Sequence, residues 1–95
     1  MPQYRKKPVV IEAWRNLTGD PEYDPPGSNE LMFAPGWLNA AIRAGYIQHG
    51  GRGTLLVYTL EGPMRAEVGD WIIQSVRGEM YPCKHDIFIE TYEKV

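Results

Sequence analysis

The C-terminal half of the chain is a series of short β-strand patterns separated by turn residues, and this feature most constrains the fold. The patterns span residues 54–60, 64–67, 71–76, 79–83 and 87–92. They are rich in β-branched and aromatic residues, and the spacing of the turns between them is typical of antiparallel β-structure. Arg77-Gly78 has the length and the glycine of a tight hairpin turn. We therefore expect a C-terminal antiparallel β-meander.

Two further elements are expected before this meander. Residues 8–14 form a β-branched run that begins with a proline, and we expect a strand whose buried face holds Val9, Ile11 and Ala13. Residues 35–45 carry the only helical pattern, an apolar stripe that ends at Gly45, a suitable C-terminal cap. The fold class is therefore α+β, with an N-terminal strand, one short helix and the meander.

A chain of 95 residues has room for a single domain, here residues 1–95. The stretch 16–30 is rich in glycine and proline and predicts an irregular loop. Its acids Asp20, Glu22 and Asp24 lack the spacing of a calcium-binding loop. Residues 50–53, Gly-Gly-Arg-Gly, predict a second flexible tract, in which Arg52 and successive backbone amides could bind an anion.

The later strand patterns carry apolar residues on both faces, and one short helix cannot cover both sides of a sheet. Trp71 and Ile73 alternate with Ile72, and Ile87 and Ile89 with Phe88. Two arrangements would solve this problem: the sheet curls into a small barrel, or a second subunit covers the remaining face. Small chains often bury surface by association, so we favour a homodimer.

Charge and cysteine content exclude several classes of function. The 10 basic and 12 acidic residues give a net charge of −2, which provides no general electrostatic attraction to duplex DNA or to an anionic membrane. No apolar run approaches the roughly 18 residues of a membrane span. Cys83 is the single cysteine and cannot form an internal disulfide, so we expect a reducing cytoplasm.

Several linked motifs resemble a known family. They are Tyr4 to Trp14, Thr59-Leu60-Glu61-Gly62-x-Met64, Gly69 to Ile73, Gly78-Glu79-x-Tyr81-Pro82-Cys83-Lys84, and Asp86-Ile87-Phe88 with Thr91-Tyr92-Glu93. The chain is similar in these motifs to a family of small bacteriophage and prophage proteins of unassigned activity. The resemblance implies a role in the cytoplasm of a bacterial host. His85 stands where the family usually has proline, so any mechanism that depends on His85 would be peculiar to this chain.

Cys83 is the weak candidate for a catalytic residue. Lys84 and His85 follow it, and such neighbours could stabilise a thiolate nucleophile. However, the sequence has no glycine-rich nucleophile turn. Cys83, His85, His49 and Asp86 also lack the pair spacing of a zinc site. We therefore expect no metal and no cofactor, and we retain a small cysteine-dependent enzyme only as an alternative.

Basic and aromatic residues provide the stronger candidate for a binding site. Aromatic rings beside cationic groups stack bases and hold phosphates, and the same residue types are enriched at protein-binding hot spots. The candidate ligand-binding residues are Arg5, Lys6, Lys7, Trp14, Arg52, Arg77, Tyr81 and Lys84.

These observations favour a non-enzymatic accessory module of a phage or prophage. Its expected partner is a host protein or a small anionic, nucleotide-type ligand, and host takeover or counter-defence is the expected role. A component of the virion or of its assembly is the other alternative.

Overall fold

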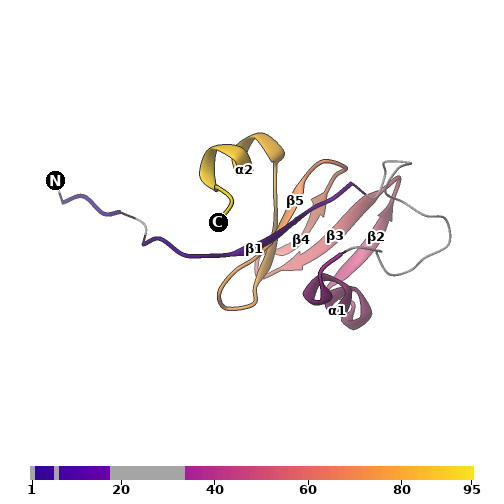
Figure 1. The fold of residues 1–95 in the computed structure, drawn as a ribbon. Coiled ribbons are helices and arrows are strands. Elements are labelled where there is room, and N and C mark those ends of the chain that lie inside the picture. Colours follow the sequence, from indigo (N-terminus) through magenta and orange to yellow (C-terminus); the bar gives the residue numbers. More distant parts are fainter. Residues whose placement is uncertain (1, 6, 18–33) are drawn as a thin grey trace.

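The computed structural model describes residues 2–5, 7–17 and 34–95. Six strands and two helices are formed in these ranges. In chain order they are β1 (Glu12–Arg15), α1 (Gly36–Ala44), β2 (Ile47–Gly51), β3 (Thr54–Thr59), β4 (Gly62–Ala66), β5 (Trp71–Gln74), β6 (Met80–Cys83) and α2 (His85–Thr91). Figure 1 shows that the chain before β1 projects away from the sheets. We call this segment the N-terminal arm; its described residues are 2–5 and 7–11.

The strands form two antiparallel sheets of three strands each. The first has the order β1-β5-β6 and the second the order β2-β3-β4. In the first sheet Ala13 lies opposite Ile73, and Ile73 lies opposite Tyr81. The described residues therefore confirm the α+β class. Their strands do not close into a barrel, and the C-terminal half is divided between two sheets instead of forming one meander.

The hydrophobic core lies between the two sheets and α1. Ile72 comes from the first sheet, Leu55 and Val57 come from the second, and Leu38 comes from α1. The predicted helix is confirmed because its apolar stripe packs into this core. Gly45 ends it with a φ of 86°, and its N–H donates to the carbonyl oxygen of Ile42. This left-handed cap suits glycine.

The predicted first strand is only partly correct. Pairing with β5 begins at Glu12, which lies opposite Gln74, because β5 ends there. Val9 is therefore 47% exposed instead of buried. Trp14, on the opposite face, packs against the core. The predicted irregular loop at 16–30 lies outside the described residues from position 18 onward.

The predicted strand at 87–92 is wrong, because His85–Thr91 forms α2. The β-branched residues Ile87 and Ile89 predicted extended structure, but both are exposed, one on each flank of Phe88. Phe88 and Tyr92 are four residues apart and so share one side, where the Phe88 ring stacks on Trp71. Packing of this aromatic face has overridden strand propensity.

Two smaller predictions also need correction. The tract predicted to be flexible is part of β2 and its turn to β3, and the φ of Arg52 in that turn is 55°. β2 was not predicted as a strand, because Ile47 is its one buried apolar residue and its sequence shows no alternating apolar pattern. The Arg77-Gly78 pair lies in a wider connection, residues 75–79, in which Ser75 N–H donates to the Glu79 carbonyl oxygen.

Asn16 links the end of β1 to the second sheet. Its side chain is fully buried, and its Nδ2 donates to the carbonyl oxygens of Gly53 at 3.0 Å, Ala66 at 3.3 Å and Glu67 at 3.3 Å. Its backbone N–H donates to Asp70, and its carbonyl oxygen accepts from Gly69. One residue thus joins β1, the β2–β3 turn and the segment that leads from β4 to β5.

Substitution of Asn16 should weaken this junction. Asn16→Ala leaves buried carbonyl oxygens without a donor, and we expect the free energy of unfolding to fall by roughly 1–3 kcal/mol. Asn16→Asp should cost more at neutral pH, because a carboxylate would face carbonyl oxygens. Burial raises the pKa of such a carboxyl, so the extra cost in unfolding free energy should shrink as the pH falls through that pKa.

Urea unfolding between pH 4 and 8 measures both effects, with Gln48→Glu at an exposed position as the control. An Asn16→Asp variant of wild-type stability at every pH would contradict the assignment.

Candidate functional site

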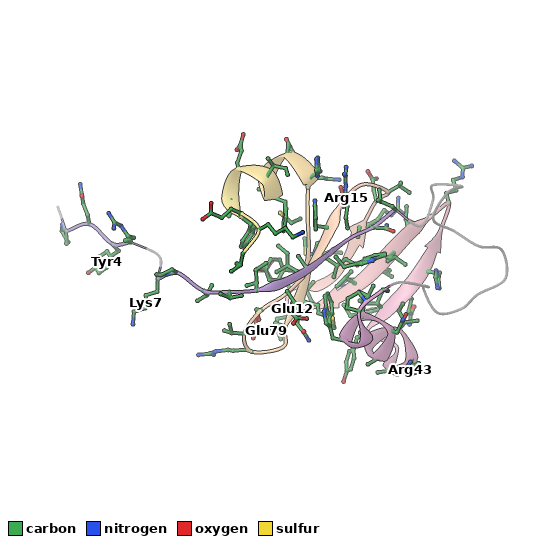
Figure 2. All side chains as sticks on the ribbon, viewed as in Figure 1. Tyr4, Lys7, Glu12, Arg15, Arg43 and Glu79 are labelled. Atoms are coloured by element: carbon green, nitrogen blue, oxygen red, sulfur yellow. The ribbon has the colours of Figure 1, made fainter. Side chains whose placement is uncertain are left out.

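The structure distributes the predicted basic residues over separate parts of the molecule. Arg5 and Lys7 are exposed on the N-terminal arm, and Lys6 lies outside the described residues. Arg52 is exposed in the β2–β3 turn, and Arg77 is exposed in the connection between β5 and β6. Figure 2 places Tyr4 and Lys7 on the arm, well away from Arg15 at the far end of β1.

Lys84 is engaged in an ionic cluster that fixes the turn before β5. Its Nζ donates to Asp70 Oδ2 at 3.1 Å and lies 3.6 Å from Glu67 Oε2. The hydrogen bond to Asp70 raises the pKa of Lys84. Asp70 is itself buried and also accepts from the Glu67 backbone N–H at 2.9 Å. Lys84 lies after β6, whereas Arg77 lies before it, so the two side chains start from opposite ends of that strand.

The predicted aromatic site residues also point in different directions. Trp14 packs against the core on the inner face of its sheet. Tyr81 lies on the outer face, where its hydroxyl is 3.5 Å from that of Tyr92. Burial, followed by this contact with Tyr92, raises the pKa of Tyr81 to about 12. The described candidate residues are therefore not gathered at one place on the molecule.

Cys83 is in a poor environment for a nucleophile. Burial raises the pKa of its thiol, and the nearby carboxylates of Asp70 and Asp86 raise it further. The imidazole of His85 is held by another group, because Trp71 Nε1 donates to His85 Nδ1 at 3.0 Å. In the described ranges no group of three His, Cys, Asp or Glu side chains is arranged to hold a metal ion.

The aromatic residues of α2 and β5 border an apolar groove that sequence analysis missed. Trp71 and Phe88 stack with ring centroids 3.9 Å apart, and Tyr92 tilts against Phe88 at 5.1 Å. A groove of about 460 Å³ runs between these rings and the N-terminal arm. Its apolar lining also includes Val9, Val10, Ile11, Ala13 and Val95. We call it the α2 groove. It was missed because α2 was predicted as a strand.

A second apolar surface lies at the turn between β3 and β4. It consists of the exposed side chains of Tyr46, Tyr58, Leu60 and Met64, and we call it the Leu60 surface. Leu60 is 84% exposed because β3 ends one residue before it. Two adjoining hollows, of about 340 and 350 Å³, share Leu60 and Met80 in their lining. The sequence signal was an apolar residue directly before the turn triplet Glu61-Gly62-Pro63.

Comparison with models of protein families, with curated proteins and with solved structures finds no match to this chain. No helix in the described part of the chain has the length and apolar character needed to span a membrane. The two apolar surfaces and the charges around them are the features of the described residues that point to a function.

The environment of Cys83 leads to a testable pH dependence. Because the pKa of its thiol is raised in the folded protein, the folded chain contains less thiolate near pH 8 than the unfolded chain does. A thiol-specific chromogenic reagent should therefore react more slowly with the native protein than with the protein in urea, and the native rate should rise at higher pH. Cys83 is the only thiol, so the reaction reports on one site. A native thiol that reacts faster than the unfolded one at pH 7 would restore the enzyme alternative.

Proposed function

We propose that this chain is a non-enzymatic accessory protein of a bacteriophage or prophage, which acts in the cytoplasm of the bacterial host by binding a host protein. The Leu60 surface is the proposed binding site. The observation that carries the proposal is the exposure of Leu60, whose side chain stands 84% open between two hollows and beside two exposed tyrosines.

The turn that presents Leu60 is held in place by its own hydrogen bonds. Thr59 Oγ1 donates to the Gly62 carbonyl oxygen at 2.7 Å, and Glu61 N–H donates to Thr59 Oγ1 at 3.1 Å. A partner that binds here therefore meets a turn already in place, which lowers the entropic cost of association. Tyr46 and Tyr58 flank it on neighbouring backbone segments, because Tyr58 N–H donates to the Tyr46 carbonyl oxygen at 2.9 Å. Tyrosine is a residue type enriched at binding hot spots.

The charges around this surface favour a protein partner over a nucleotide. Glu61 and Glu79 are the charged residues that line the two hollows. Their carboxylates would repel phosphate groups, whereas lysine or arginine side chains at the edge of a protein interface would complement them. The basic residues expected to hold a nucleotide are divided between the arm, two turns and the Lys84 cluster, so the nucleotide-type ligand has less support.

Removal of the Leu60 side chain should weaken partner binding selectively. Burial of a leucine contributes about 1.5–3 kcal/mol, so Leu60→Ser should weaken the affinity by roughly 10- to 100-fold. The tagged chain is used to capture proteins from infected-host lysate, and the affinity of a captured protein is then measured by calorimetry. Val68→Ser is the matched control, because Val68 is an exposed apolar residue on the turn before β5.

The same capture experiment separates the alternatives. A host protein whose binding depends on Leu60 but not on Val68 supports the proposal. Capture of virion proteins would favour the assembly role. Absence of any partner that depends on Leu60 would contradict the proposed site, and the Cys83→Ser variant should behave as wild type throughout.

A further inference from the structure

The hollow of about 340 Å³ beside Leu60 is built from both sheets. Met64 comes from the second sheet, where it lies opposite the fully buried Val57. Pro82 comes from the first sheet, where it lies opposite the fully buried Ile72. Because paired residues on neighbouring strands point to the same face, both walls of the hollow continue the core faces of the sheets. We call it the Met64 hollow.

Two carboxylates line the Met64 hollow, and no lysine, arginine or histidine of the described residues does. Glu61 comes from the turn between β3 and β4, and Glu79 directly precedes β6. Both side chains are exposed, and neither carboxylate has a hydrogen bond or an ion pair within the part of the chain that the structure describes. Two unpaired negative charges on one hollow make it complementary to a cation.

The arginines that lie nearest in the sequence do not supply this cation. Arg65 lies opposite Leu56, so its side chain leaves β4 on the face opposite to that of Met64. Arg77 lies two residues before Glu79, but it lines neither hollow and forms no ion pair with any described residue. An occupant of the hollow must therefore bring its own positive charge.

We infer that the Met64 hollow receives an arginine side chain of the host protein, an inference that rests on the proposed function of the Leu60 surface. Met64 and Met80 both line the hollow and provide an apolar surface for the aliphatic part of the arginine. The planar guanidinium has five N–H donors, so one group can donate to Glu61 and Glu79 together. A lysine ammonium is more strongly hydrated, so its transfer to a hollow walled by methionines costs more free energy.

The second hollow, of about 350 Å³, indicates which side chain accompanies the arginine. It is lined by Tyr46, Tyr58 and Leu60, and it shares Glu79 with the Met64 hollow. Its two tyrosines suit an apolar side chain that packs against their rings. Leu60 lines both hollows, so the host segment must place an arginine on one side of Leu60 and an apolar side chain on the other.

A blocked dipeptide, acetyl-Leu-Arg-amide, tests the inference on the wild-type chain. Acetyl-Leu-citrulline-amide has the same shape without the charge. In methionine-methyl NMR titrations the Met64 and Met80 signals should shift with the arginine probe. The dissociation constant should be about tenfold or more higher for the citrulline probe, because it lacks charged hydrogen bonds. Signals that do not shift, equal affinity for the two probes, or equally tight binding of acetyl-Leu-Lys-amide would overturn the inference.

Matched double variants separate the local charge from the net charge. Glu61→Gln with Glu79→Gln should remove the preference for arginine over citrulline. Glu90→Gln with Glu93→Gln removes the same number of exposed carboxylates outside both hollows and should leave the preference intact. A preference that survives the first pair would overturn the inference. Failure of the probes while host-protein capture still depends on Leu60 contradicts only the arginine site, whereas absence of Leu60-dependent capture contradicts the proposed function whatever the probes do.

Discussion

The junction at Asn16 is the interaction on which the arrangement of both sheets depends. The two sheets have no strand in common, so their relative position depends on core packing and on the bonds that connect them. A single buried amide supplies donors to three backbone carbonyl oxygens, from the β2–β3 turn and from the end of β4. Because Asn16 directly follows β1, the same bonds fix the line of that strand. By fixing β1, these bonds also set the direction in which the N-terminal arm leaves the sheet.

The position of α2 determines which part of the first sheet remains open. The stack of Phe88 on Trp71 and the contact of Tyr92 with Tyr81 hold the helix over the end of the sheet that lies near β6. The helix has only seven residues, so it cannot also cover the arm beside β1. The α2 groove is open because the helix is too short to cover the arm. The apolar alternation of Val9, Ile11 and Ala13 thus continues beyond the part of the sheet that the helix contacts at Trp71.

Local sequence patterns correctly predicted the helix and strands that apolar periodicity and turn residues are sufficient to specify. The helix at 35–45 and the strands that correspond to β3, β4, β5 and β6 follow from apolar periodicity and turn residues. The sequence pattern predicted the wrong structure where tertiary packing determines it. α2 forms because Phe88 stacks on Trp71 and Tyr92 packs against Phe88. β2 forms because Ile47 packs in the core and the backbone of β2 pairs with β3. The sequence also could not show how the candidate binding residues are distributed in space. Composition identified Arg52, Arg77 and Lys84 as cationic, but only the topology reveals that turns and strand ends hold them apart.

The two apolar surfaces have separate structural causes. Leu60 is exposed because β3 ends one residue before it, whereas the α2 groove is open because α2 is too short to reach the arm. The groove and the two hollows at the Leu60 surface have no lining residue in common. A substitution on one surface therefore leaves the lining of the other unchanged, so the loss of a bound protein after Leu60→Ser, but not after a substitution in the groove, would assign the contact to the turn between β3 and β4.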